Sequence, residues 1–245
     1  MTIYKVRRGV ESYGHAIGIL LIDCSTPFIP GDVGNASTYP FPVIYKTVRG
    51  VTLNRLIEEG DLSFTETVIN AAKELEKLGV KAISSDCGYM IHFQKQVAEK
   101  LSIPVIMSSL IQLPMLERTI GPGQKIGVIC ANRKRLTPDL LEIAGVKDKA
   151  NIVIVGMEEK PYFRGPILDE KNTLDSDKIE KEIVEKATEL VASSPEISSI
   201  LLECSNMPPY AHVVQKVTGR PVFDFTTLIN LFYQASFRKP FEGFY

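Results

Sequence analysis

The sequence has no apolar run that approaches the roughly 18 residues needed by a transmembrane helix. The run Ala16–Ile22 near the N-terminus is also too short for the core of a signal peptide, and Asp23 follows it without a cleavage-type site. We therefore expect no membrane partner and a cytoplasmic location.

The sequence also lacks an excess of charge of either sign. Lysine and arginine number 28 and aspartate and glutamate 29, which gives a formal net charge of −1. Without a global basic field, we expect no nucleic-acid partner. No GxGxxG or Walker-type loop occurs, so a nucleotide cofactor is not expected. His15, His92 and His212 lack the spacing of metal ligands. We predict a protein with no metal and no cofactor.

The four cysteines contain no CxxC pair and are widely spaced. In a chain without an export signal, they are expected to be reduced thiols. We interpret Cys24 and Cys130 as structural, because Cys130 ends a buried strand and free cysteine is commonly a core residue. We do not interpret Cys87 and Cys204 as structural, because of their positions in an internal repeat.

Short apolar runs alternate with amphipathic stretches along the chain. The expected strands are Ile17–Ile22, Ala82–Ser85, Ile103–Met107, Ile126–Cys130, Ile152–Gly156, Ile200–Glu203 and Val222–Phe225. The expected helices are Ser63–Leu78, Ile91–Leu101, Pro138–Ala144, Asp177–Ala192, one from about Tyr210, and Leu228–Phe237. This alternation predicts the α/β class, with parallel sheets and ligands at the carboxyl ends of the strands.

The chain resembles itself at an offset of 117 residues, which aligns Cys87 with Cys204 without a gap. Asp86 then falls on Glu203, an acid on an acid. All strand–helix–strand units look alike to some degree. Here, however, the cysteine lies at the same turn in both copies, just beyond the carboxyl end of a strand, and this favours a duplication.

A duplication predicts two pseudo-symmetric, Rossmann-like halves with parallel sheets and one active site between them. We expect the first half to comprise residues 1–117 plus 220–245, and the second half to comprise residues 118–219. We expect the C-terminal segment to return to the first half because a helix, Leu228–Phe237, remains to be packed after the repeat ends.

Two halves that face each other would bring both thiols to one cleft from opposite sides. This geometry suits the removal of a proton from one face of a carbon and the return of a proton to the other. The N-terminus of the helix after each cysteine would help to lower the pKa of the thiol. Asp86 and Glu203 would oppose this, and we expect them to point aside because neighbouring strand positions alternate faces.

These residues resemble the aspartate/glutamate racemase superfamily, the cofactor-independent racemases that use two cysteines. Its relatives include hydantoin racemase, arylmalonate decarboxylase and maleate isomerase. The resemblance covers nearly the whole chain and rests on Ser85–Tyr89, Leu202–Pro208, Gly127–Asn132 and the loop Gly31–Asn35. Glutamate racemases typically carry a histidine two residues after the second cysteine, and this chain has Asn206 there. The fold and the dual-thiol chemistry therefore carry over better than any substrate.

The resemblance implies a PLP-independent amino-acid racemase or isomerase in which Cys87 and Cys204 are the catalytic acid and base. The implied substrate is a small carboxylate, an amino acid such as aspartate or glutamate or a derivative. A homo-oligomer, dimer or higher, is also implied. The alternatives are a decarboxylase or cis–trans isomerase of the same superfamily, or a non-catalytic small-molecule sensor on the same fold.

Polar residues and turns that follow the strands are the candidates for substrate binding. Such residues also form turns without any ligand, and this reading stays open beside the functional one. The candidate set is Asp23, Ser25, Asn35, Gly88, Tyr89, Asn132, Ser205 and Asn206.

Overall fold

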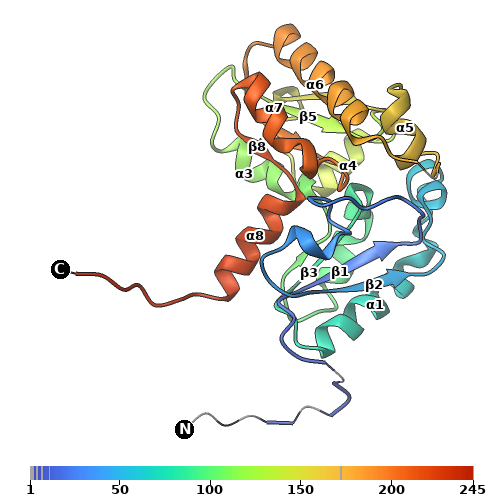
Figure 1. Cartoon of the computed structure of the whole chain (residues 1–245), viewed down its shortest axis with the longest axis vertical. Coiled ribbons are helices and arrows are strands. Elements are labelled where there is room, and N and C mark those ends of the chain that lie inside the picture. The colour runs from blue at the N-terminus through green and yellow to red at the C-terminus, as the bar shows by residue number, and fades with distance from the viewer. Residues whose placement is uncertain (1–2, 4, 7, 11, 172, 245) are drawn as a thin grey trace.

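A computed structural model describes residues 3, 5–6, 8–10, 12–171 and 173–244, and this part of the chain contains two four-stranded sheets (Figure 1). The first has the order β2-β1-β3-β4 and comprises β1 (Ile17–Ile22), β2 (Val43–Val48), β3 (Ala82–Ser85) and β4 (Val105–Ile106). The second has the order β6-β5-β7-β8 and comprises β5 (Lys125–Cys130), β6 (Ile152–Gly156), β7 (Ile197–Leu202) and β8 (Val222–Phe223). All strand pairs are parallel, which confirms the predicted α/β class.

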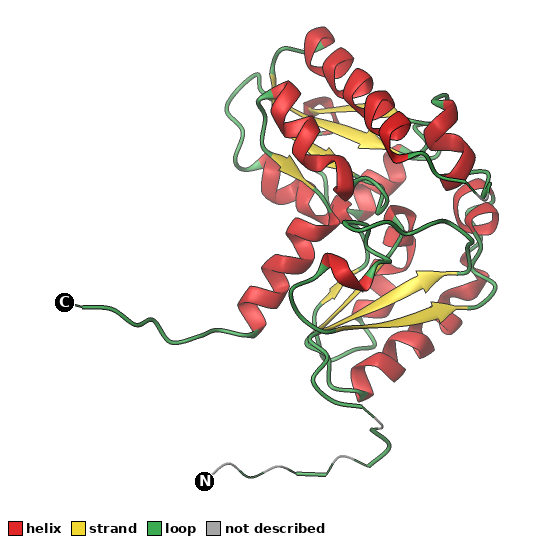
Figure 2. Cartoon of the chain, in the orientation of Figure 1, coloured by secondary structure: helices red, strands yellow, loops and turns green. Residues whose placement is uncertain are grey.

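Helices lie over the faces of both sheets (Figure 2). The α-helices are α1 (Thr65–Lys77), α2 (Gln94–Ala98), α3 (Leu113–Glu117), α4 (Pro138–Ile143), α5 (Pro161–Ile167), α6 (Ser176–Ser193), α7 (Ala211–Thr218) and α8 (Phe225–Ser236). Short 3₁₀ segments are η1 (Ala36–Thr38), η3 (Leu62–Phe64), η4 (Gly88–Phe93), η5 (Ser109–Gln112), η6 (Lys149–Asn151) and η7 (Pro208–Tyr210). Segment η2 (Asn54–Glu58) is a short π-helix. No helix in the described ranges is both long enough and apolar enough to cross a membrane.

The helices form where an apolar face coincides with suitable ends. In α1, Val68, Ala72 and Leu75 are buried at helical spacing. In α6, the side chain of Asp175 caps the first turn by accepting the Lys178 N–H at 3.2 Å. Helix α7 ends at Gly219, whose φ of 63° is the left-handed conformation that glycine adopts without strain.

The two halves repeat the same hydrogen bonds at equivalent places. The Asp86 N–H donates to the Leu20 carbonyl, and the Glu203 N–H donates to the Ile129 carbonyl. Each bond joins the end of a central strand to its neighbour, β3 to β1 and β7 to β5. The sheets also share one strand order. The predicted two-fold architecture is therefore confirmed at the level of topology.

Several segments differ from the predicted elements, among them α3, which was not predicted. Strand β2 was not predicted, because an edge strand with the mixed sequence Val-Ile-Tyr-Lys-Thr-Val is only half-buried and gives no clear alternation. Helix α5 was also not predicted, since it contains Pro166. The segment after Cys87 starts as the 3₁₀ turn η4 and becomes α-helical only in α2, instead of forming one helix over Ile91–Leu101.

The end of the chain contacts both halves. Strand β8 pairs with β7 in the second sheet, with Ile200 opposite Val222. Helix α8 then buries Phe225, Leu228 and Ile229 in the apolar cluster that contains Ile17 of β1. The division of the chain into two domains stays a proposal, and we now place the crossing back to the first half at Asp224, after β8.

Asp224 connects β8 to α8 and gives a test of this crossing. Its buried carboxylate accepts the Thr227 N–H and the Thr226 hydroxyl, both at 2.8 Å. Asp224→Ala should lower the free energy of unfolding by about 1–2 kcal/mol, since it removes the helix cap. Asp224→Asn keeps a capping oxygen and should retain most of the stability. Urea denaturation measures both, and equal losses in the two variants would contradict the capping role.

Candidate active site

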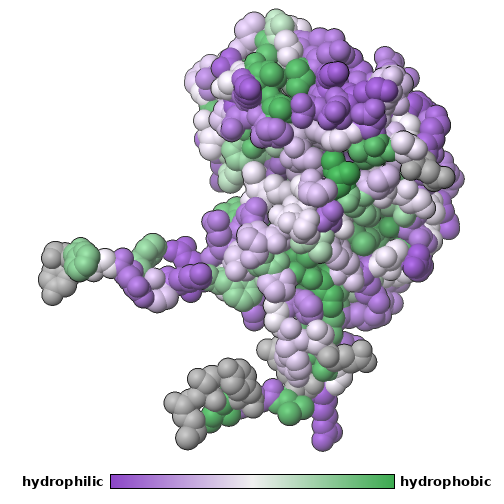
Figure 3. Space-filling model, in the orientation of Figure 1, coloured by the Kyte–Doolittle hydropathy of each residue, from purple (hydrophilic) through white to green (hydrophobic). Residues whose placement is uncertain are grey.

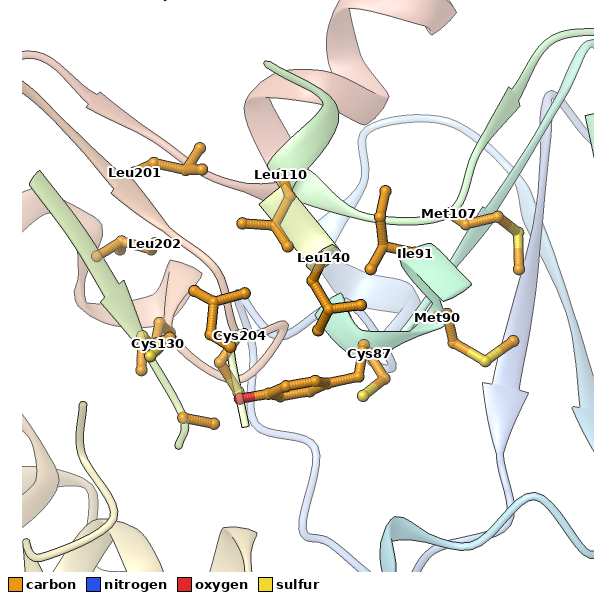
Figure 4. Close-up of a cluster of buried hydrophobic side chains, with 14 of the residues drawn as sticks. Cys87, Met90, Ile91, Met107, Leu110, Cys130, Leu140, Leu201, Leu202 and Cys204 are labelled. Atoms are coloured by element: carbon orange, nitrogen blue, oxygen red, sulfur yellow. The ribbon is translucent and has the colours of Figure 1, made fainter. Parts of the chain in front are cut away.

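The two cysteines of the repeat lie at the carboxyl ends of the central strands. Cys87 follows β3 and immediately precedes η4, and Cys204 follows β7. Both side chains are free thiols and are 6% and 7% exposed. Figure 4 shows them reaching the same apolar cluster from different segments of the chain. The sheets therefore present one thiol each to a common space.

That space is a partly open cavity whose empty volume, including the part open to solvent, is about 360 Å³. The first half contributes Ile22, Cys24, Thr26, Phe28, Leu53, Ile57, Asp86, Cys87, Gly88 and Tyr89. The second half contributes Ala131, Ile167, Leu168, Glu203, Cys204, Ser205 and Asn206. No lysine, arginine or histidine occurs in this lining as far as the structure describes the chain. The site is suited to a small molecule and not to a dianion.

The resting environment opposes ionisation of both thiols. Burial raises the pKa of Cys87 well above its ordinary value, and the nearby carboxyl groups of Glu203 and Asp86 raise it further. Burial and Glu203 do the same to the pKa of Cys204. Backbone N–H groups at Tyr89 and Asn206 act in the opposite direction, each stabilising the thiolate two residues before it.

The prediction that Asp86 and Glu203 point aside is wrong, because both line the cavity. Each acid lies just beyond the last residue of its strand, where strict alternation no longer governs direction. Asp86 accepts the Ile22 N–H at 2.9 Å, and Glu203 accepts the Ala131 N–H at 3.1 Å. Because these N–H donors lie at the ends of the neighbouring strands, they orient both acidic side chains along the edge of each sheet, toward the cavity.

Hydrogen bonds from side chains to strand-end carbonyls join the halves around the cavity. The Ser205 hydroxyl donates to the Asp86 carbonyl in a short contact. The Tyr89 hydroxyl donates to the Asn132 carbonyl at 2.7 Å. The Ser109 hydroxyl donates to the Glu203 carbonyl at 3.0 Å. Because each bond crosses between the halves, together they join the two strand ends that carry the thiols.

Four of the eight predicted substrate-binding residues line the cavity: Gly88, Tyr89, Ser205 and Asn206. The Asn206 amide is oriented by Asp32, to which its Nδ2 donates at 2.6 Å. Asp32 is itself buried, which raises its pKa to about 7. Asn206 can thus offer its amide oxygen, which lies 3.5 Å from the Cys204 sulfur.

The other four residues of that prediction do not line the cavity, and each has another role. Asp23 pairs with Arg49 at 2.9 Å. Ser25 donates its backbone N–H to Glu170 at 2.7 Å. Asn35 caps η1 through its side chain. The remaining residue, Asn132, receives the Tyr89 hydroxyl on its carbonyl. These residues shape the surroundings of the site without facing it.

Several cavity residues were not among the predicted substrate-binding residues. Cys24 was interpreted as structural, yet it lines the cavity with Thr26 and Phe28. Their position directly after β1 is a signal that could have identified them, since ligands bind where parallel strands end. Ile167 and Leu168 gave no such signal, because they follow a helix, α5, that the sequence did not predict. Cys130, by contrast, is fully buried in β5.

No metal centre is apparent in the described residues, which contain no cluster of three or more histidine, cysteine or acidic side chains suited to a metal ion. The three histidines lie outside the cavity lining. The chemically distinctive groups of the site are therefore its thiols and its carboxyl groups.

Comparison with solved structures defines the class of the fold. Arylmalonate decarboxylase aligns over 90% of both chains with a TM-score of 0.55 and 17% identity. Allantoin racemase from Pseudomonas fluorescens covers 89% of both chains with a TM-score of 0.56 and 16% identity. A glutamate racemase from Bacillus anthracis aligns over 91% of this chain and 84% of its own, with a TM-score of 0.55 and 16% identity. The fold is that of the aspartate/glutamate racemase superfamily, as the resemblance implied.

Curated sequences narrow the family. A dimethylsulfoniopropionate lyase from Durusdinium sp. clade D is 34% identical over 235 residues, which cover 93% of this chain and 77% of the relative. Dimethylsulfoniopropionate lyase 7 from Emiliania huxleyi is 31% identical over 93% of this chain and 69% of its own. The chain belongs to the family of dimethylsulfoniopropionate lyases. No protein-family model matches the chain.

The predicted function therefore needs correction. The sequence resemblance implied an amino-acid racemase, but the relatives that match most of the chain above 30% identity are lyases. The cavity is consistent with this correction, since a dicarboxylic amino acid would meet the acids Asp86 and Glu203 with no cationic side chain in the described lining.

Gly88 gives a test of how tightly the site is built. A Cβ at this position would lie 1.7 Å from Glu203 Oε1 and 2.8 Å from the Glu203 carbonyl oxygen. Gly88→Ala should cost about 1–3 kcal/mol of stability by overpacking and should displace the carboxylate. Gly121→Ala is the matched control, because its Cβ would have only ordinary contacts from 3.5 Å. Thermal denaturation compares the two, and equal effects would refute the close approach.

Proposed function

We propose that this chain cleaves dimethylsulfoniopropionate into dimethyl sulfide and acrylate. Two things support the proposal: membership of a lyase family, and a cavity in which two thiols from different halves line one small volume. The second observation carries it, because a proton next to the carboxylate of the substrate could be reached there by a side-chain base.

The reaction requires one base. A thiolate removes a proton from the carbon next to the carboxylate, and the electron pair of that C–H bond forms the carbon–carbon double bond. The carbon–sulfur bond breaks, and its electron pair leaves on sulfur, so that a sulfonium becomes neutral dimethyl sulfide. Acrylate remains, and the thiol later releases its proton to water. No oxidant, reductant or cofactor enters this scheme.

The second thiol has a different task in this scheme, because no proton is returned to carbon. As the proton leaves, negative charge grows on the oxygens of the substrate carboxylate. An S–H group aimed at those oxygens stabilises that charge, as preorganised donors generally do. The hydroxyl group of Thr26 shares the cavity and can assist as a second donor.

Substitutions at the two cysteines test this division of work. At the position of the base, both Ser and Ala should reduce kcat by at least about 10³-fold, since neither supplies a thiolate. At the position of the donor, Ala should reduce kcat about 10²-fold, while Ser keeps a hydrogen-bond donor and should lose about tenfold or less. Release of dimethyl sulfide, measured by gas chromatography, gives kcat for each variant.

The matched control is Cys24→Ser, a half-buried thiol of the same cavity that is assigned no chemical step. It should change kcat less than either of the other cysteines. Wild-type protein that releases no dimethyl sulfide would refute the proposed function. If the Ser and Ala variants lowered kcat in the same pattern at Cys87 as at Cys204, the division into base and hydrogen-bond donor would be refuted.

A homo-oligomer stays a prediction. Large apolar side chains are exposed on α8 and on the segment that follows it, namely Leu231, Phe237, Phe241 and Phe244. Figure 3 shows apolar surface on the extended C-terminal segment. Light scattering at micromolar concentration should give at least twice the mass of one chain. The mass of a single chain would contradict the prediction.

A further inference from the structure

Asp86 and Glu203 each leave one oxygen without a partner. Asp86 uses Oδ1 to accept the Ile22 N–H, and its Oδ2 is buried with no hydrogen bond among the described residues. Glu203 uses Oε2 to accept the Ala131 N–H, and its Oε1 is buried and unpaired in the same way. Their exposed fractions are 4% and 0%. A buried acceptor without a partner costs free energy, so these two oxygens require an explanation.

Both acids belong to the same cavity and occupy equivalent places in the two halves. Each directly precedes one of the paired cysteines, at the end of β3 or β7. In each acid, one carboxylate oxygen accepts a hydrogen bond from a backbone N–H at the end of the neighbouring strand. The pair therefore approaches the cavity from opposite sides, as the thiols do.

The cavity offers these carboxyl groups no counter-charge. Its described lining contains no lysine, arginine or histidine. Burial raises the pKa of Asp86 to about 8 and that of Glu203 to about 7, which is expected for acids that lack a cation. A small cationic ligand in the cavity would supply the missing charge.

We propose that Asp86 and Glu203 form the subsite for the positively charged group of the substrate, and that they select an onium ligand over a neutral molecule of the same shape. The inference rests on the proposed function for the identity of the cation, a dialkyl sulfonium. The aromatic rings of Phe28 and Tyr89 also line the cavity and are the alternative source of cation selectivity.

The chemistry of the lyase reaction predicts how these acids act. The sulfonium loses its charge as the carbon–sulfur bond breaks, so attraction to the carboxylates is strongest before the transition state. An interaction that is stronger in the bound substrate than in the transition state lowers KM, and because it stabilises the bound state more, it cannot raise kcat. Asp86 and Glu203 are thus residues for binding and specificity and take no part in proton transfer.

The test compares two ligands of equal shape. Dimethylsulfoniopropionate carries S⁺ where 4-methylpentanoate carries a neutral CH group. Their affinities are measured by calorimetry in a Cys87→Ser/Cys204→Ser background, in which the substrate is not consumed. This background should bind the sulfonium at least about 30-fold more tightly than its neutral isostere, as expected for a desolvated charge pair.

Asp86→Asn and Glu203→Gln, each added to this background, should reduce that preference at least about fivefold, since each removes one of the two carboxyl groups that can ionise beside a bound cation. Affinity for 4-methylpentanoate should be kept. Glu182→Gln is the matched control: Glu182 is a buried acid that accepts the Tyr162 and Phe163 N–H groups away from the cavity. In the enzyme with both thiols, the two cavity variants should raise KM at least about fivefold and change kcat less than about threefold.

Equal binding of the two ligands by the background, or binding of neither, would overturn the inference. So would a preference that survives in both cavity variants, which would assign selectivity to the aromatic rings. Because the two acids are equivalent, either variant alone is decisive if the other fails to fold. A protein that discriminates between the ligands without releasing dimethyl sulfide would refute the proposed function and leave the cation subsite in place.

Discussion

The contact between the carboxyl ends of the two sheets is the constraint on which the site depends. Strand ends expose backbone groups that must find partners when they are buried. Here side chains from the opposite half supply them: Ser205 to the Asp86 carbonyl, Ser109 to the Glu203 carbonyl, and Tyr89 to the Asn132 carbonyl. The bonds that satisfy the strand ends therefore also join the two halves around the cavity.

The same contact between the halves fixes the electrostatics. Excluding water raises the pKa of every acid in the cavity, and the acids then raise the pKa of the thiols beside them. An empty site of this kind is a poor environment for a thiolate. In the proposed reaction, a bound cation weakens the repulsion between the carboxylates and the thiolate, so that the substrate itself improves the conditions for its own deprotonation. A histidine two residues after the second cysteine is not needed for that effect.

The architecture could be predicted because the strands and the repeat leave clear patterns in the sequence. Buried β-branched runs and the shared offset of Cys87 and Cys204 required no knowledge of tertiary contacts. The direction of Asp86 and Glu203 was not predictable, since it depends on N–H donors at neighbouring strand ends. The roles of Asn35 and Asn132 were equally hidden, because a polar residue in a loop reads the same whether it caps a turn or binds a ligand.

In the proposed reaction a symmetric fold serves a molecule with two unlike ends, and the cavity departs from symmetry accordingly. Cys24, Thr26 and Phe28 extend from β1 on the first side, whereas Ile167 and Leu168 provide an apolar wall on the second. A racemase needs two equivalent bases because a proton leaves one face of a carbon and returns to the other. An elimination needs one base and a place for the departing group. Two duplicated halves can therefore keep both thiols and use one as a base and the other as a hydrogen-bond donor, because different residues surround each sulfur.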